Sequence, residues 1–233
     1  MPTRYAIYYV PAPESALWRF GSEVLGYDAY TGKAVPQWHP DGVSAETWHA
    51  MTADPRLYGF HATLKAPFRL KEGSNETQLV SSLKRFAAGR APFDLGKWIV
   101  KPIASSRPDN AFLALVPAAP PVELACLEEA VVRHFDAMRA RLTEAEVAKR
   151  NPTRLSERQR AYLAAHGYPY VLEEFRFHMT LSGAIEKARE IGPLLAERAR
   201  DSGVGPDLRL DRLGLFRQED GGRFRVVKVV PLG

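Results

Sequence analysis

Apolar residues recur along the chain at two spacings, one typical of strands and the other typical of helices. In the first half, an apolar residue at every second position predicts strands at residues 4–10, 59–65, 93–104 and 111–116. A spacing of three to four residues predicts helices at 14–25 and 75–88. Residues 26–58, rich in Gly, Pro and Trp, are expected to be irregular, and residues 105–110 to form a turn.

The second half partly repeats this order of elements. Helices are expected at residues 122–139 and 185–199, and strands at 175–182, 207–217 and 223–230, the last two joined by a hairpin turn. A polar, helical insert at about 143–170 precedes the strand at 175–182. The pattern predicts one α+β domain over residues 1–233, with lobe one at about 1–116 and lobe two at about 117–233, related by a suspected structural duplication.

The same five-residue motif occurs once in each half, on a predicted strand that precedes a helix. It reads Phe-His-Ala-Thr-Leu at 60–64 and Phe-His-Met-Thr-Leu at 177–181. Because side chains alternate across a strand, His61 and Thr63 share one face, and His178 and Thr180 do likewise. We refer to these four as the motif side chains. If they converge, two imidazoles and two hydroxyls surround one small anionic group.

Paired histidines and threonines suit the cleavage of a phosphate ester. An imidazole titrates near neutral pH, so one can deprotonate water while the other protonates the leaving oxygen. Threonine hydroxyls can donate hydrogen bonds to the phosphoryl oxygens. Lys65 is expected on the histidine face by strand alternation, where it would add a positive charge. This chemistry needs no metal and no cofactor.

The motifs resemble those of the two-histidine phosphoesterase superfamily, which includes LigT-like RNA ligases and cyclic nucleotide phosphodiesterases. The resemblance implies two pseudo-symmetric lobes whose antiparallel sheets face a central cleft, with helices outside. It also implies that His61 and His178 are catalytic and that Thr63 and Thr180 bind phosphate. Within the superfamily, residues 4–9, 58–68 and 167–171 are most similar to an uncharacterised bacterial branch associated with phosphonate-metabolism operons.

The insert is where the chain departs from smaller members of that superfamily. It carries Arg150, Arg154, Arg158 and Arg160 directly before the second motif, and at least one is expected to reach the cleft and bind a second substrate phosphate. Of these four, Arg154 and Arg158 are the arginines expected to bind that phosphate. Tyr168 and Tyr170 flank Pro169 in the following loop and are expected to line the cleft.

Composition adds limits to this interpretation. The net charge of +5, from 32 basic and 27 acidic residues, favours anionic ligands without indicating a general nucleic-acid binder. No signal peptide or membrane span is recognisable, so a cytoplasmic protein without membrane contacts is expected. The single cysteine, Cys126, lies in a helical apolar pattern and is expected to be a buried thiol.

The sequence therefore predicts a metal-independent cyclic phosphodiesterase acting on a small sugar phosphate or nucleotide. The resemblance points to a ribose cyclic phosphate formed in phosphonate breakdown. RNA-end processing or 2′-5′ RNA ligation, with RNA as partner, remains an alternative, as does a non-catalytic nucleotide or RNA binder. A divalent-metal hydrolase is disfavoured because no carboxylates flank the motifs. The oligomeric state is left open.

Overall fold

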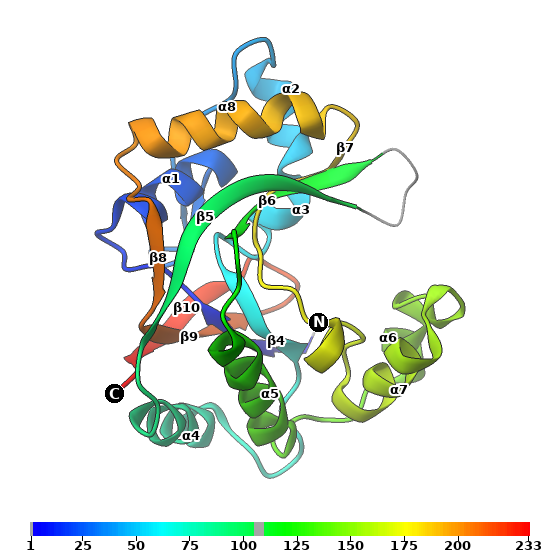
Figure 1. Ribbon diagram of the computed structural model, residues 1–233. Helices are drawn as coiled ribbons and strands as arrows, with labels where there is room; N and C mark the ends of the chain where they lie inside the picture. The colour runs from blue at the N-terminus through cyan, green and yellow to red at the C-terminus, as the bar shows by residue number, and fades with distance from the viewer. Residues whose placement is uncertain (1, 105–109) are drawn as a thin grey trace.

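The computed structural model describes residues 2–104 and 110–233 and has a mixed α+β architecture (Figure 1). The helices are α1 (Ala16–Leu25), α2 (Ala45–Met51), α3 (Ala53–Arg56), α4 (Glu76–Ala88), α5 (Val122–Asp136), α6 (Glu144–Lys149), α7 (Glu157–His166) and α8 (Ala188–Asp201), with 3₁₀ turns η1 (Pro152–Arg154) and η2 (Leu172–Glu174). The strands are β1 (Arg4–Tyr9), β2 (Tyr27–Asp28), β3 (Lys33–Ala34), β4 (Ala62–Phe68), β5 (Phe93–Ala104), β6 (Ala111–Pro117), β7 (Met179–Ile185), β8 (Asp207–Leu210), β9 (Arg212–Gln218) and β10 (Arg225–Pro231). The turn predicted at 105–110 lies almost wholly outside the described residues.

An antiparallel, eight-stranded sheet in the order β10-β9-β1-β4-β7-β6-β5-β8 forms the centre of the molecule. The strands β4 and β7 are joined only at Ala62 and Met179, and we call this junction the seam. On each side of the seam, four strands form a half-sheet. The predicted α+β fold with two antiparallel halves is confirmed.

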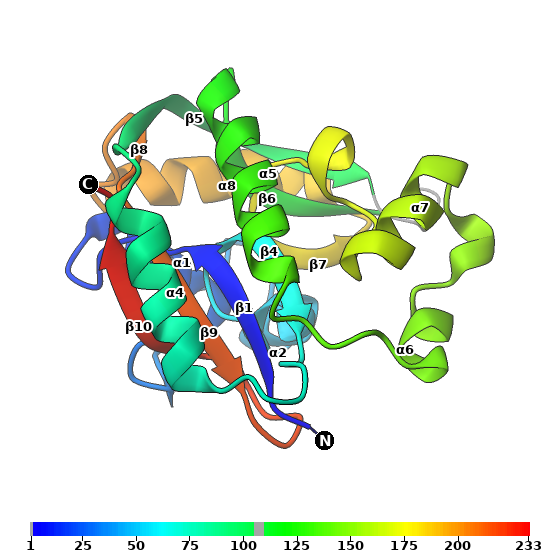
Figure 2. The ribbon, with the colours of Figure 1, turned by 90° about the horizontal axis from the view of Figure 1, so that it is seen from below.

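Helices cover the outer faces of the two half-sheets. Helices α4 and α5 pack on the half-sheet that contains β4, β9 and β10, and Figure 2 shows them across its outer side. Helix α8 packs on β5 and β6, and α1 to α3 pack on β7. Local sequence determines where these helices begin: the Ser15 side chain accepts a hydrogen bond from the backbone of Trp18 at the start of α1, and Asn75 with Gln78 forms a capping box at the start of α4.

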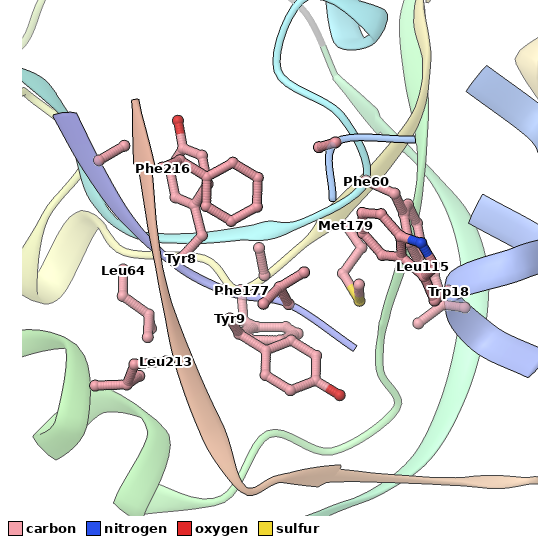
Figure 3. Packing of buried hydrophobic residues seen from close by; sticks show 14 of the residues in the cluster. Tyr8, Tyr9, Trp18, Phe60, Leu64, Leu115, Phe177, Met179, Leu213 and Phe216 are labelled. Carbon is pink, nitrogen blue, oxygen red and sulfur yellow. The ribbon is translucent and has the colours of Figure 1, made fainter. Parts of the chain in front are cut away.

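Buried apolar side chains from both half-sheets form one continuous cluster. Figure 3 shows part of it, with Tyr8 beside Phe216 on one side and Phe60 and Met179 on the other. Tyr9 and Phe177 contact each other at 5.9 Å between ring centroids, and so pack β1 against the chain that leads into β7. This shared core holds the two motifs at a constant relative position.

Three expectations from the sequence are wrong in the described structure. The half-sheets are not the chain segments 1–116 and 117–233, because β9 and β10 pair with β1 and β4, while β7 and β8 pair with β6 and β5. Residues 207–217 form two strands, β8 and β9, on opposite edges of the sheet. Cys126 is exposed, because it faces away from the α5 stripe of Leu124, Leu127 and Val131.

Two short helices, α2 and α3, occupy part of the region expected to be irregular. At the start of α2 the Ser44 side chain accepts a hydrogen bond from the backbone nitrogen of Thr47, and the buried Trp48 anchors the helix. The Arg56 guanidinium, 5% exposed, donates to the backbone oxygens of Leu25 and His49 and so ties α3 to α1. Within residues 2–104 and 110–233, no helix has the length and apolar character needed to cross a membrane.

Candidate active site

The two motifs meet at the seam. Residues directly opposite in an antiparallel pair have their side chains on the same face. Since Ala62 lies opposite Met179, continuing this register by one residue on each side would bring the four motif side chains together on the other face, with His61 opposite Thr180 and Thr63 opposite His178. Ala62 and Met179 are fully buried, whereas each motif side chain is partly exposed. The register therefore forms a two-by-two arrangement of imidazoles and hydroxyls.

Both histidines are held in the same way by the backbone. The Nδ1 of His61 lies 2.9 Å from the carbonyl oxygen of Gly59, and the Nδ1 of His178 lies 2.6 Å from that of Arg176. Because a carbonyl oxygen only accepts, Nδ1 carries the proton in both rings. The Nε2 atom of each neutral ring is therefore free to accept a proton. Gly59 adopts a φ of +76°, where a side chain would also meet Ala29, so the turn before His61 requires glycine.

His61 lies in an aromatic environment. Tyr8 stacks on its ring with 3.7 Å between centroids, and Tyr58 lies 6.2 Å away. Burial lowers the pKa of His61 to about 4, the hydrogen bond to Gly59 opposes this shift, and the charge of His178 adds to it. Burial also lowers the pKa of His178. The Thr63 hydroxyl donates to the unprotonated Nε2 of His61 over 3.2 Å. Both imidazoles are therefore neutral at pH 7, with an unprotonated Nε2 atom.

A cavity of about 480 Å³ adjoins the second motif. Its walls include Thr63 and His178, and the predicted cleft residues Tyr168 and Tyr170 both line it. Apolar side chains make up much of the remainder, namely Leu64, Ala66, Ile103, Ala104, Phe112, Val171 and Phe175. The cavity is large enough for a sugar or a nucleoside beside the histidines.

Glu128 of α5 borders this cavity and was not identified from the sequence. Its side chain is 1% exposed, and one carboxylate oxygen accepts a hydrogen bond from the backbone nitrogen of Leu172 over 3.1 Å. Burial raises the pKa of Glu128 to about 7, against the effects of that hydrogen bond and of the Lys65 charge. The apolar helical stripe around Glu128 was its only signal in the sequence, since a carboxyl group within such a stripe is rare.

A family model described as Protein of unknown function (DUF1045) matches residues 63–225, well over half of the chain. The chain belongs to the DUF1045 family. This match includes Thr63 and the whole second motif.

Two curated relatives of this DUF1045 chain are both named Ribose 1,5-bisphosphate phosphokinase PhnN. The protein from Janthinobacterium sp. (strain Marseille) is 42% identical over 186 residues, which cover 80% of this chain and 40% of that protein. The protein from Laribacter hongkongensis (strain HLHK9) is 34% identical over 228 residues, which cover 97% of this chain and 51% of that protein. The chain thus spans about half, or less, of the length of the curated relatives it matches.

Solved structures with a similar chain path include phosphoesterases. A structure described as a phosphoesterase is 16% identical, covers 99% of each chain and has a TM-score of 0.48. E. coli LigT in complex with 3′-AMP is 15% identical and covers 100% of this chain and 99% of that chain, with a TM-score of 0.45.

In the DUF1045 chain, Lys65 does not lie on the histidine face. Tyr8 pairs with Thr63 but Ile7 pairs with Lys65, so Leu64 is an extra residue in β4 and forms a β-bulge. The bulge turns Lys65 to the outer face, where its ammonium donates to the Val132 carbonyl and to Asp136, each over 3.2 Å. The expectation of a phosphate contact from Lys65 is therefore wrong, because alternation ends at the bulge.

The structure does not bring Arg154 or Arg158 to the motif side chains. Arg154 is exposed at the end of η1, and Arg158 is exposed on α7 beside Ser156 and Glu157. It is Arg150, at the end of α6, that approaches the site: its guanidinium lies 5.1 Å from the ring centroid of Tyr168. The helix of the insert turns its outer arginines to solvent, which residue spacing alone did not indicate.

Charged contacts hold the insert against the sheet. Arg69, directly after β4, donates two hydrogen bonds of 3.0 and 2.9 Å to the two carboxylate oxygens of Glu146 in α6. This contact lowers the pKa of Glu146 to about 2. Among the residues that the structure describes, no three His, Cys, Asp or Glu side chains are grouped so as to hold a metal ion.

Proposed function

We propose that the chain is a metal-independent phosphoesterase that hydrolyses a cyclic phosphate, or another phosphodiester, of a small sugar phosphate or nucleotide. The observation that carries the proposal is the shared face of the four motif side chains, with both Nδ1 atoms bound to backbone carbonyls. Two imidazoles with unprotonated Nε2 atoms at one site meet the requirement for one acid and one base.

In the proposed reaction, the phosphate binds between the two rings. The Nε2 of one neutral histidine takes a proton from water as the water oxygen forms a bond to phosphorus. The second histidine, protonated at Nε2, gives its proton to the ester oxygen as the old phosphorus–oxygen bond breaks. A cyclic diester and water thus give one monoester, and the histidines exchange their proton states.

Binding of the phosphate would also favour the protonated form of the histidine that acts as the acid. Both histidines are neutral at pH 7 in the free protein because burial lowers their pKa values. A negative charge nearby favours the protonated imidazole, so binding of the phosphodiester raises the pKa of the histidine that donates. The Thr63 hydroxyl lies 3.2 Å from Nε2 of His61, and in the proposed complex it and the Thr180 hydroxyl would donate to the non-bridging oxygens.

A phosphorylated ribose is the substrate that the relatives favour. Both curated relatives carry ribose 1,5-bisphosphate in their names, although this chain spans at most 51% of their length. Together with the resemblance to the branch associated with phosphonate-metabolism operons, this supports a ribose cyclic phosphate as substrate. LigT in complex with 3′-AMP is a nucleotide-bound structure of similar chain path, which keeps cyclic nucleotides among the compounds to test.

Product analysis tests the proposal. The purified chain, in excess EDTA and in water labelled with ¹⁸O, is given a ribose or adenosine cyclic phosphate and followed by ³¹P NMR. We expect one monoester product with one labelled oxygen, and no effect of the chelator. Absence of turnover with every small cyclic phosphate would favour a non-catalytic binder, and loss of activity in EDTA would favour a metal enzyme.

A further inference from the structure

Arg150 is a cation held at the edge of the candidate site. It is partly buried, and its guanidinium packs on the ring of Tyr168, which in turn lines the cavity with Thr63 and His178. Within residues 2–104 and 110–233, no carboxylate pairs with it. An arginine that stacks on an aromatic ring keeps its N–H donors free at the rim of the guanidinium.

Arg4 approaches the same region from the start of β1. Its Nε and Nη2 atoms donate to the Gln218 side-chain oxygen over 2.8 and 2.5 Å, which fixes the guanidinium over the ring of Phe224 at 5.6 Å. Phe224 stacks on Tyr58 at 5.2 Å, and Tyr58 lies near His61. A neutral amide is the side-chain partner of Arg4 here, so its charge is not neutralised by that contact.

Tyr8 connects the two arginines to the histidine pair. It is fully buried and stacks on His61. Burial raises the pKa of Tyr8, and the charges of both Arg4 and Arg150 oppose that shift, so both guanidinium groups lie within electrostatic range of its hydroxyl. Beside His61 there is therefore a buried phenol within electrostatic range of two cations.

The other side of the site is mixed in charge. Beside His178 the cavity is lined largely by apolar side chains, together with Glu128, Glu174 and Arg176. A second negative group on the substrate would be attracted to the two guanidinium groups of Arg4 and Arg150, which contact a neutral amide and aromatic rings.

We infer that Arg4 and Arg150 bind a second phosphate of the substrate, a monoester carried by the same sugar as the cyclic phosphate. This inference rests on the proposed function and names its substrate class: a bisphosphorylated sugar and not a simple cyclic nucleotide. A dianionic monoester accepts charge-assisted hydrogen bonds from both guanidinium groups, and the cyclic monoanion then lies between the histidines.

Arg150→Met tests the inference with two ribose cyclic phosphates that differ only in a phosphate on the 5-hydroxyl. We expect kcat/KM to fall at least tenfold for the 5-phosphorylated compound and to change less than twofold for the other, because only the first compound loses charge-assisted hydrogen bonds from the guanidinium group. Arg154→Met, an exposed arginine of the same insert, is the matched control and should change neither value. Equal losses on both compounds, or no loss on either, would overturn the inference.

A binding measurement separates this inference from the proposed function. Ribose 5-phosphate, a monoester that has no phosphodiester for the histidines to cleave, is titrated calorimetrically into the wild type and the Arg150→Met variant. We expect at least tenfold weaker binding by the variant, and Arg150→Lys should recover part of the loss. If the wild type hydrolyses neither cyclic compound, the proposed function fails, and this titration still decides whether the phosphate site exists.

Discussion

Single hydrogen bonds at the histidines determine which nitrogen atoms can react. The carbonyls of Gly59 and Arg176 hold the two Nδ1 protons, so rotation or the alternative tautomer would break a bond of 2.9 or 2.6 Å. Such partners orient an imidazole in the way that outer-shell groups orient metal-bound histidines. The sequence places both carbonyls two residues before their histidines, so the motif itself builds this arrangement.

Glu128 gives a prediction about stability at the residue scale. Its pKa is about 7 in the folded chain and about 4.3 in an unfolded one. The folded state therefore binds more protons at Glu128 between these values, and the contribution of this one group to the free energy of unfolding should fall as pH rises from about 4.5 to 7. The glutamine of Glu128→Gln does not titrate. The free energy of unfolding of this variant, relative to that of the wild type, should therefore rise over this window by about 3 kcal/mol.

Urea unfolding at pH 4.5 and pH 8 measures that difference. The variant should be the more stable protein at pH 8, because it avoids a buried charge while its amide oxygen still accepts from Leu172. Glu123→Gln, an exposed glutamate of the same helix, should give the same difference from wild type at both pH values. A Glu128→Gln variant that is less stable than wild type at pH 8 would show that the carboxylate is ionised and needed.

Helix α1 supports the first motif at the scale of elements. Gly21 lies so close to Phe60 that a Cβ atom on it would be 2.1 Å from the ring. Phe60 is fully buried and directly precedes His61. Gly21→Ala should therefore displace the ring, lower the free energy of unfolding by about 1–3 kcal/mol and reduce kcat on the cyclic substrate.

Gly205 provides the control for that substitution, since a Cβ atom there meets no atom within 4 Å. Gly205→Ala should leave both the unfolding free energy and kcat close to wild type. Thermal unfolding and steady-state kinetics on both variants measure the two effects. Wild-type stability in Gly21→Ala would mean that Phe60 can move without cost and that α1 does not fix the motif.

Most elements could be predicted from the sequence, because their apolar spacing is regular. The strand at 93–104 has the predicted bounds, and α4 begins one residue later than expected. Predictions failed where the spacing changes within an element. The buried leucines stand at even-numbered positions in Leu208 and Leu210 and at odd-numbered positions in Leu213 and Leu215. This change at residues 211–212 marks the break between β8 and β9. The β-bulge at Leu64 has no such signal, because it depends on the pairing with β1.

At the scale of the whole molecule, the site depends on how the two halves of the chain interleave. Each half-sheet takes two strands from each half of the chain, so neither half forms a complete lobe alone. Strand order of this kind arises from long-range pairing, which local apolar spacing does not encode. The motif side chains could be selected from the sequence because the motif repeats. Arg150, Tyr8 and Glu128 gain their significance only from tertiary neighbours.

The central claim is that His61 and His178 act together on one phosphate. The most direct test measures kcat of the wild type, His61→Ala, His178→Ala and the double variant on the same cyclic phosphate. Each single substitution should lower kcat by roughly 10² to 10⁴, and the double variant should resemble the worse single variant, because one histidine without the other completes no proton transfer cycle. Full activity in either single variant, or losses that multiply in the double variant, would contradict a shared catalytic pair.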